Sequence, residues 1–154
     1  MKKLNPLFLA AMAESVNNSP YYVHTSMEIK EIDWGYCLMQ LAVQEKHLQP
    51  YGMVHGGVYA AMVDAAAYWA VFTQLDDNAK MITIDLKLNY LGSASNGLLF
   101  AKGKSIKLGK TLGIGEASIT DEADKLLTHG TATFMVLGDL EINRNFELPP
   151  RFLD

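Results

Sequence analysis

Hydrophobic positions run almost without interruption from Val54 to Val71, in the segment VHGGVYAAMVDAAAYWAV. Its alanines are strong helix formers, and the pattern predicts a helix over residues 56–75. A helix this apolar is either a membrane span or the buried centre of a folded domain. Asp64, near the middle, would cost about 2.5–3.5 kcal/mol inside a bilayer, and the chain has no second apolar segment of this length. We therefore expect a buried central helix and no membrane partner.

The second half of the chain alternates between apolar and polar positions. In ITIDLKLNY, the apolar residues Ile82, Ile84, Leu86, Leu88 and Tyr90 share one face. This alternation predicts a strand with one buried face. Short connections between the strands that follow predict an antiparallel meander. The further strands are expected at residues 97–107, 111–120 and 125–137, with turns at 93–97, 108–110 and 121–124.

A helix is expected within residues 1–20. Two lysines, an apolar patch and the Ala-x-Ala pattern at Ala11–Ala13 also resemble a short signal peptide. However, Asn5 can cap a helix that begins at Pro6, and we favour that interpretation. The segments that follow are two strands at 19–35 and 36–48, joined near Asp33–Gly35, and a loop rich in helix-breaking residues at 49–57.

The order of these elements predicts the fold. A single antiparallel sheet with one apolar face needs cover, and a helix that is apolar on every side needs to be surrounded. A strongly curved sheet wrapped around the central helix meets both needs. The sequence thus predicts an α+β chain with the hot-dog fold, in one domain over residues 1–154.

Charge and cysteine content exclude some classes of function. The net charge is −4 and no block of basic residues occurs, so no nucleic-acid partner is predicted. The single cysteine, Cys37, cannot form an internal disulfide, which fits a reducing, cytoplasmic location. Cys37 lies in an apolar run, and we interpret it as a buried filler. A reactive thiol is the alternative, but no activating partner lies near it in the sequence.

Two glycines and one acid give the apolar segment its reactive groups. Gly56 and Gly57 lie at the expected helix start, where the first amides lack internal partners and favour an anion or a polarised carbonyl oxygen. Alternatively, these glycines only form a tight turn. A buried unpaired carboxylate is costly, so Asp64 is either functional or bonded to hydroxyls such as those of Tyr59 or Tyr68.

His55 and Asp64 are nine residues apart. Nine helical steps of about 100° make a half turn and rise about 13 Å, so the two side chains are expected to point apart within one chain. If both serve one reaction centre, the helix start must come from another chain. If both residues are functional, this spacing therefore predicts a catalytic dimer.

The stretch HLQPYGMVHGGVYAAMVDAAAYWAV resembles the signature of the hot-dog thioesterase superfamily, in particular the branch with the phenylacetate-pathway acyl-CoA thioesterases and the 4-hydroxybenzoyl-CoA thioesterase of the His-Gly-Gly type. The family pattern is Asn-Pro-x-Gly-x-x-His-Gly-Gly, with Asp or Glu nine residues after the His. ITIDLKLNYLGSA and IKLGKTLGIGEASITD also resemble family strands, so the likeness covers about residues 23–137. It implies an acyl-CoA thioesterase without metal or redox cofactor, with coenzyme A as part of the substrate. It also implies a dimer or homotetramer with the active site at the subunit interface.

The resemblance also implies roles for individual residues. Asp64 of the facing subunit would be the nucleophile or the general base for water, and the Gly56 amide would polarise the thioester carbonyl as an oxyanion hole. Gln49 stands where the family often has Asn, which keeps the amide and adds a methylene. The other implied roles are that His55 shapes the loop, Gly57 keeps the turn open, Thr83 helps to place the water, and Lys107 and Lys110 lie near the coenzyme A phosphates.

Two tyrosines are further candidates for the substrate site, and two other functions are alternatives to thioester hydrolysis. Tyr59 and Tyr68 lie on the helix of Asp64 and are candidates for the acyl pocket. The alternative functions are a hot-dog dehydratase or hydratase, which needs an acid and a base that meet at the substrate, and a non-catalytic acyl-CoA binding module. Ordinary structural roles are expected for His24, His47 and His129, which lack metal-ligand spacing, and for Trp34, Trp69 and Tyr51.

Overall fold

The computed structural model describes residues 2–138 and 148–153. Six of its strands form one antiparallel sheet, in the order β2-β3-β5-β6-β7-β4, and β1 pairs with β8 in a separate two-stranded sheet. The elements are β1 (Lys3–Leu4), α1 (Pro6–Asn17), α2 (Pro20–Thr25), β2 (Met27–Asp33), β3 (Tyr36–Ala42), a 3-10 helix η1 (Glu45–His47), α3 (Gly56–Phe72), β4 (Lys80–Tyr90), β5 (Leu98–Leu108), β6 (Leu112–Thr120), β7 (Leu126–Leu137) and β8 (Phe152–Leu153).

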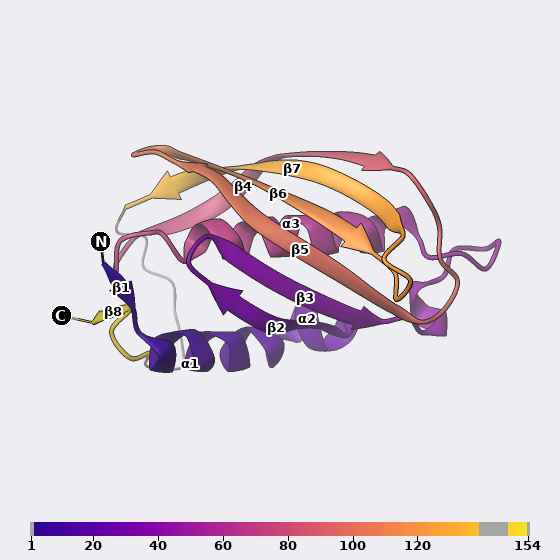
Figure 1. Cartoon of the computed structure of the whole chain (residues 1–154), viewed down its shortest axis with the longest axis horizontal. Helices are drawn as coiled ribbons and strands as arrows, with labels where there is room; N and C mark the ends of the chain where they lie inside the picture. Colours follow the sequence, from indigo (N-terminus) through magenta and orange to yellow (C-terminus); the bar gives the residue numbers. More distant parts are fainter. Residues whose placement is uncertain (1, 139–147, 154) are drawn as a thin grey trace.

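The large sheet curves around α3, and α1 and α2 lie beside β2 (Figure 1). Glycines on the inner face of the sheet bring its backbone close to the helix. A Cβ atom added at Gly103 of β5 would lie 2.1 Å from the carbonyl oxygen of Ala66, and one at Gly115 of β6 would lie 3.0 Å from that of Ala67. The expected hot-dog arrangement of a curved antiparallel sheet around a central helix is therefore confirmed.

The central helix α3 begins at Gly56 as expected but ends at Phe72, earlier than the expected 75. Thr73 follows it, and its hydroxyl donates to the Ala70 carbonyl and accepts from the Gly35 amide. These bonds satisfy a carbonyl that the helix end would otherwise leave without a partner. At 17 residues the helix packs on the sheet, and no helix among residues 2–138 and 148–153 is long and apolar enough to cross a membrane.

The expected N-terminal helix is confirmed as α1. The Asn5 side chain accepts a hydrogen bond from the Leu7 amide at 3.0 Å, and Pro6 is the first helical residue. Phe8, Met12 and Val16 are the buried residues of this helix. Their spacing of four places them on one face, which packs into the core beside β2.

The strand expected over residues 19–35 is wrong in its first part. Residues Pro20–Thr25 form the short helix α2, which ends at Ser26 in a left-handed conformation with φ 60°. Proline lacks the amide that a strand would use for pairing but suits the first position of a helix. The strand β2 begins only at Met27. The residues before it therefore stand as a separate wall beside α3.

The expected meander is correct for β5, β6 and β7 but wrong for β4. β4 pairs with β7, and β5 pairs with β3 on the other side. The connection from β4 to β5 is short, yet the two strands are not neighbours in the sheet. A short connection limits the distance between strand ends but does not force the strands to pair. β4 is consequently one of the two edge strands.

The predicted buried face of β4 is also only partly correct. A bulge between Thr83 and Asp85 inserts one residue into the strand, and this reverses the side to which later residues point. Leu86 and Leu88 are half-buried against the core, whereas Ile82 and Ile84 are each 48% exposed. The first half of this edge strand therefore presents apolar side chains to the outside of the protomer.

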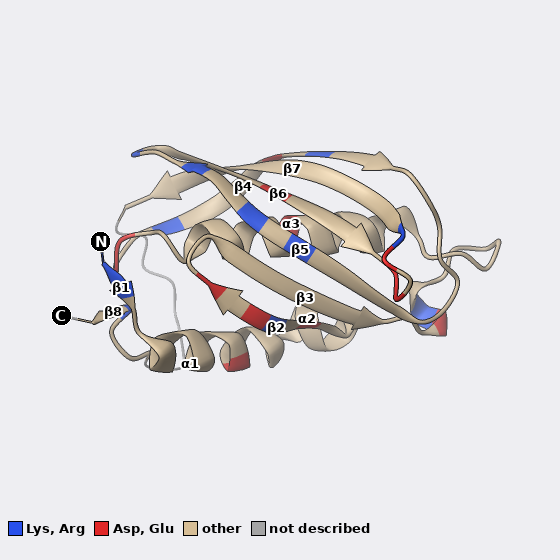
Figure 2. Cartoon of the chain, in the orientation of Figure 1, with Lys and Arg blue, Asp and Glu red and all other residues tan. Residues whose placement is uncertain are grey.

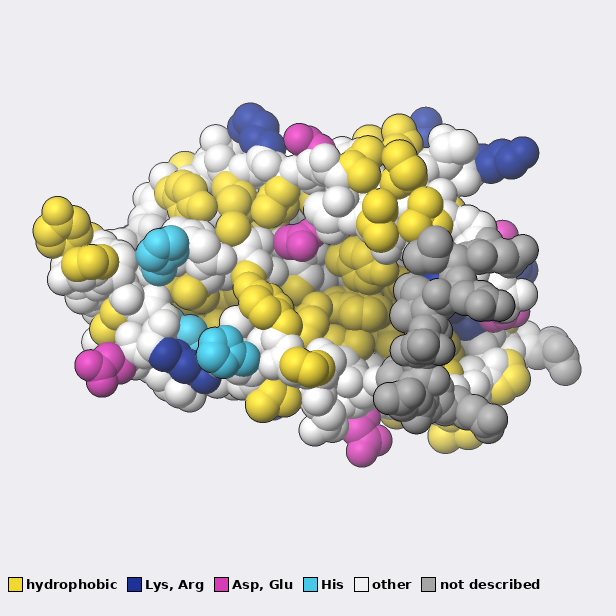
Figure 3. Space-filling view, turned by 180° about the vertical axis from the view of Figure 1, so that it is seen from behind, with side chains coloured by type: hydrophobic (Ala, Val, Ile, Leu, Met, Phe, Trp, Pro, Cys, Tyr) yellow, Lys and Arg dark blue, Asp and Glu magenta, His cyan; other side chains and the backbone are white. Residues whose placement is uncertain are grey.

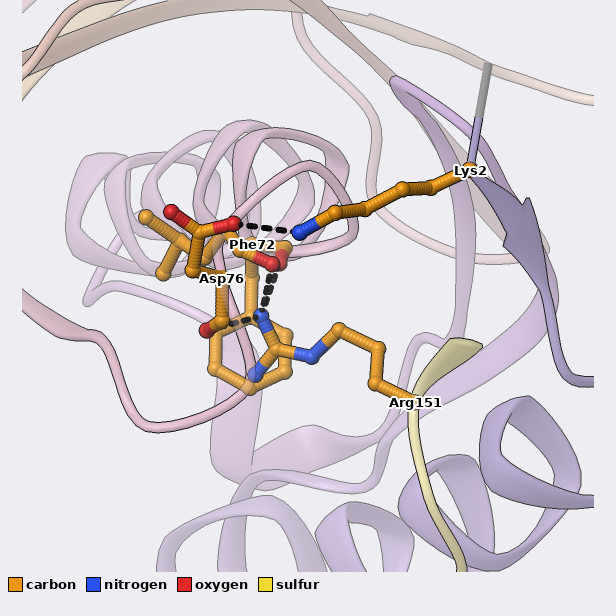
Figure 4. Close-up of polar contacts among 5 residues, drawn as sticks. Lys2, Phe72, Asp76 and Arg151 are labelled. Atoms are coloured by element: carbon orange, nitrogen blue, oxygen red, sulfur yellow. Dashed lines mark hydrogen bonds and ion pairs between the residues drawn. The ribbon is translucent and has the colours of Figure 1, made fainter. Parts of the chain in front are cut away.

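The C-terminal segment binds to the end of α3 (Figure 4). The buried Arg151 donates hydrogen bonds to the carbonyls of Leu75 and Asp76, the latter at 3.0 Å, and its guanidinium lies 4.4 Å from the centre of the Phe72 ring. Lys2, from the other end of the chain, forms an ion pair with Asp76 at 2.7 Å. Both chain ends thus fix the turn that follows the central helix.

Candidate active site

The start of α3 is shaped by His55, which is the residue before the first helical turn. Its backbone is extended, and its Nδ1 accepts a hydrogen bond of 2.8 Å from the Gly57 amide. A Cβ at Gly57 would lie 2.9 Å from this nitrogen, so the cap requires glycine there. Within the described residues, the Gly56 amide has no hydrogen-bond partner. One helix-start amide is thus capped by His55 and its neighbour remains available.

Tyr90 of β4 fixes the other side of this turn. Its hydroxyl donates to the Gly56 carbonyl at 3.1 Å, and a Cβ at Gly56 would lie 3.2 Å from the Tyr90 ring. The two glycines therefore do more than allow a turn. Their lack of side chains makes room for the imidazole on one side and the phenol on the other.

Asp64 lies in the middle of α3, half-buried, and is bonded to the edge strand. The Thr83 hydroxyl donates to its Oδ1 at 2.8 Å. The two tyrosines expected as alternative partners form hydrogen bonds with other groups: the Tyr59 hydroxyl accepts from the Ala94 amide, and the Tyr68 hydroxyl donates to the Met81 carbonyl. Burial raises the pKa of the Asp64 carboxyl, and the Thr83 hydrogen bond lowers it in part. A carboxylate with a raised pKa in an apolar cavity is suited to proton transfer or nucleophilic attack.

Two adjoining cavities lie along the same side of α3. One, of about 470 Å³, contains Asp64 and Thr83, and the other, of about 340 Å³, contains His55 and Gly57. The cavities share three lining residues: Tyr21, Met27 and Ala61. Figure 3 shows this face of the molecule, where hydrophobic side chains surround a hollow. The helix start and the carboxylate therefore border one continuous, mainly apolar depression.

His55 and Asp64 share no hydrogen bond within the described protomer. The predicted absence of a direct pair is therefore met, but the predicted half turn between them does not apply. His55 has extended backbone and its ring folds back over Gly57, so it faces the same side as Ala61 rather than the opposite side. A helical angle cannot be counted from a residue that precedes the helix.

Of the other predicted site residues, Tyr68 lines the larger cavity, and the rest do not line either cavity. The Gln49 side chain accepts from the Tyr51 amide and so stabilises the loop before His55. Tyr59 is buried in the core beside Tyr90, whereas Tyr68 lines the larger cavity. Lys107 and Lys110 lie at the turn between β5 and β6, and Figure 2 shows this basic turn at the end of the sheet near the chain termini. The protomer alone does not bring Gln49, Tyr59 or these lysines to Asp64.

The wall formed by α2 was missed in the sequence, where these residues were assigned to a strand. Tyr21 and Tyr22 line the larger cavity together with Trp69 of α3. For Trp69 the sequence predicts only an ordinary structural role. A signal existed, because Ser19-Pro20 has the same form as the Asn5-Pro6 pair that predicted α1. In the described part of the chain, no group of three or more His, Cys, Asp or Glu side chains is placed to hold a metal ion.

Comparisons with known proteins agree with this architecture. The sequence pattern of the thioesterase superfamily matches residues 51–128, which include the whole of α3 and β4. A relative from Listeria monocytogenes, 1,4-dihydroxy-2-naphthoyl-CoA hydrolase, is 33% identical over 110 residues, which cover 71% of this chain and 89% of the relative.

Two solved structures show the same fold at lower identity. A thioesterase from Haemophilus influenzae superimposes with a TM-score of 0.82 at 22% identity and covers 94% of this chain and 100% of its own. A Staphylococcus aureus thioesterase, solved as a variant with one glutamine replaced by alanine, has a TM-score of 0.72 at 21% identity, with 75% and 97% of the two chains covered. Together with the family match, these likenesses show that the chain belongs to the thioesterase superfamily, a family of thioester hydrolases with the hot-dog fold.

Proposed function

We propose that this protein is an acyl-CoA thioesterase in which Asp64 acts on the thioester. The observation that carries the proposal is the position of Asp64: a half-buried carboxylate, held by Thr83, in an otherwise apolar cavity of about 470 Å³. The relative from Listeria monocytogenes is named for a coenzyme A thioester, which supports coenzyme A as the thiol part of the substrate. No metal or redox cofactor is required for this chemistry.

Two courses of reaction are open to Asp64. As a nucleophile, it attacks the carbonyl carbon and forms a mixed anhydride, while the C–S bond breaks and the coenzyme A thiolate leaves and takes up a proton. Water then hydrolyses the anhydride to the free acid. As a general base, it takes a proton from water, whose oxygen attacks the same carbon directly. The C–S bond then breaks, and the coenzyme A thiolate leaves and takes up a proton. In both courses negative charge develops on the carbonyl oxygen, and the Gly56 amide is the proposed donor that stabilises it.

The proposed site is shared between two copies of the chain. β4 is a long edge strand whose amides and carbonyls can pair with a further strand, and its exposed Ile82 and Ile84 would be covered by such a partner. In this dimer the Gly56 amide of one subunit would serve Asp64 of the other. A dimer of dimers would give the homotetramer.

The bond made by His55 supports hydrolysis over dehydration. An acid–base dehydratase would need His55 to take a proton from the substrate, but its Nδ1 accepts from the Gly57 amide. The neutral ring then carries its hydrogen on Nε2 and has no free nitrogen lone pair to act as the base. The ring acts here as a helix cap. Its proposed role is therefore to hold the turn that presents the Gly56 amide, as the family resemblance implies.

Gln49, Lys107 and Lys110 keep proposed roles that depend on the partner subunit. In the Staphylococcus aureus protein, the glutamine and the glutamate that were replaced stand fifteen positions apart, and the same separation joins Gln49 to Asp64. This spacing supports a functional role for both Gln49 and Asp64. Lys107 and Lys110 are proposed to bind the coenzyme A phosphates, since exposed lysines suit this anionic group.

The first test is the substitution Asp64→Asn. Thiol release from a panel of acyl-CoA thioesters is expected to fall by a factor of about 10³ or more, as for loss of a nucleophile or base. Asp77→Asn is the matched control, because Asp77 is exposed in the turn after α3. Unchanged thiol release by the Asp64→Asn variant would overturn the mechanism.

A second test addresses the shared site. Gly56→Pro removes the amide hydrogen at a position where proline suits a helix start, and the extended His55 before it is compatible with proline. The added Cβ would lie 3.2 Å from the Tyr90 ring, so this exposed side chain must shift slightly, and circular dichroism checks that the variant is folded. Subunits carrying Asp64→Asn are then mixed with subunits carrying Gly56→Pro, each inactive alone. Random hybrid dimers hold one intact site, so about a quarter of the wild-type rate should return. No recovery in dimers shown to be hybrid would mean that Gly56 and Asp64 act within one chain.

A further inference from the structure

The helix α2 is held by two bonds, one to α3 and one to the 3-10 helix η1. The Trp69 Nε1 donates to the Tyr22 hydroxyl at 2.8 Å. At the other end, the buried His47 lies with its Nε2 2.7 Å from the Thr25 carbonyl, while its Nδ1 accepts from the Gln44 amide. α2 is therefore a positioned wall of the cavity rather than a mobile cover, and Tyr22 is held in a defined place on it.

The hydroxyl hydrogen of Tyr22 has no acceptor within the described residues. The oxygen accepts from Trp69, but it donates to no protein group there. Tyr22 is half-buried and lines the cavity that contains Asp64. Burial strongly raises the pKa of this phenol, so it keeps its hydrogen at neutral pH. A half-buried hydroxyl that lines a cavity and donates to no protein group can donate its hydrogen to an acceptor atom of a bound ligand.

No lining group of this cavity accepts the Tyr22 hydroxyl hydrogen within the described residues. Met27, Ala61 and Ala65 are apolar, and Trp69 already donates its N–H to Tyr22. The other polar side chains of the wall are Tyr21, Tyr68, Asp64 and Thr83. The Tyr68 hydroxyl donates to the Met81 carbonyl, and the Thr83 hydroxyl donates to Oδ1 of Asp64. An acyl group whose carbonyl carbon lies at Asp64 would extend along this apolar wall toward Tyr22.

We propose that Tyr22 is a specificity-determining residue that donates a hydrogen bond to a polar atom in the distal part of the acyl group. The preferred substrates are then acyl-CoA thioesters with a hydroxyl or carbonyl oxygen on the acyl part, over hydrocarbon acyl groups of the same shape. This inference rests on the proposed thioesterase function. It concerns α2, which lies outside the residues that match the family pattern.

The test compares pairs of acyl-CoA thioesters in which one member carries an oxygen atom where the other carries a carbon atom. One pair is para-hydroxybenzoyl-CoA and para-methylbenzoyl-CoA, and the other is an omega-hydroxyalkanoyl-CoA and the alkanoyl-CoA with one more carbon. For each pair, the ratio of the two kcat/KM values is measured. This ratio does not depend on the amount of folded enzyme, because both substrates meet the same preparation. The wild-type protein is expected to favour the oxygenated member of at least one pair by about tenfold, as for one buried hydrogen bond.

Three variants separate the hydroxyl from the ring. Tyr22→Phe should bring the ratio close to one, mainly by raising KM for the oxygenated substrate. Trp69→Phe keeps the Tyr22 hydroxyl and should retain a preference. Tyr36→Phe removes a hydroxyl from β3, outside both cavities, and should leave the ratio unchanged.

The outcomes are distinguishable from those of the proposed function. A wild-type protein that hydrolyses both members of each pair equally well would overturn the role of Tyr22 and leave the thioesterase intact. If Tyr22→Phe lowers kcat/KM for both members by the same factor, the proposed role of Tyr22 is also overturned, because the residue would then act only structurally. A wild-type protein without thiol release from any thioester would instead remove the proposed function.

Discussion

The substitution Gly103→Ala tests how closely the sheet positions α3, the helix that carries Asp64. Gly103 faces inward from β5, and its Cβ would lie 2.1 Å from the Ala66 oxygen and 2.3 Å from the Ala66 carbon. Both atoms belong to the backbone of α3, so no side chain can rotate away. To reach an ordinary contact of 3.4 Å, the helix must move by about 1.3 Å, and Ala66 is two residues from Asp64.

The cost of this movement follows from packing. An added methyl group in a close-packed core destabilises by about 1–3 kcal/mol, which lowers the melting temperature by roughly 2–4 °C for each kcal/mol at this chain length. A displacement of about 1 Å at a catalytic group lowers the rate by up to about 10²-fold. Circular dichroism during heating measures the first effect, and kcat/KM for thiol release measures the second at a temperature where the variant is folded.

A matched substitution separates this contact from a general effect of alanine. Gly138→Ala adds the same methyl group at a position with nothing within 4 Å of the new Cβ. It should change neither the melting temperature nor the rate. If Gly103→Ala were as stable and as active as Gly138→Ala, the direct packing of sheet on helix would not determine the position of Asp64.

Three further predictions concern Asp64, its hydrogen bond and the end of its helix. Because burial raises the pKa of Asp64, folding favours the protonated carboxyl, and the stability linked to this group is lost as pH rises through the raised pKa. Asp64→Asn should therefore raise the melting temperature at neutral pH but not below the ordinary aspartate range, and a lower melting temperature at neutral pH would contradict this. Thr83→Val removes the bond that lowers this pKa, so the acidic limb of the pH–kcat/KM profile should move to higher pH; an unmoved limb would show that Asp64 does not titrate in catalysis. Arg151→Met should lower the free energy of unfolding in urea by about 1.5–3 kcal/mol, because the carbonyls of Leu75 and Asp76 lose a charged hydrogen-bond donor. Lys2→Met removes only an exposed ion pair and should lower the free energy of unfolding much less.

Much of the fold could be read from periodicity, and the errors have local causes. The apolar run of α3 and the alternating strands β5, β6 and β7 appear in the structure close to their predicted bounds. In β4 the alternation of apolar and polar residues continues through Ile84 in the sequence. In the structure, the bulge between Thr83 and Asp85 turns the apolar residues before it and those after it to opposite sides of the strand. A bulge changes the register without changing the pattern of letters, so periodicity alone could not show which half of the strand is buried.

The candidate site was predictable where it depends on one element and not where it depends on several. The glycines and Asp64 stand out because they interrupt an apolar segment. The bond between Tyr22 and Trp69 joins residues 47 positions apart, and no spacing rule connects them. The same is true of Thr83 and Asp64, whose pairing follows from how the edge strand crosses the helix; Thr83 was expected only from the family resemblance.

The pairing of β1 with β8 affects the order in which the molecule folds. Lys3 is opposite Leu153, so this contact joins the two ends of nearly the whole chain. The entropy cost of closing a loop rises with its length, and this two-stranded ribbon has few residues to offset that cost. It is therefore expected to form after the sheet and α3, and to open before them. In hydrogen exchange, the Asn5 amide, which donates to the Arg151 carbonyl, should exchange earlier than the amides between β5 and β6.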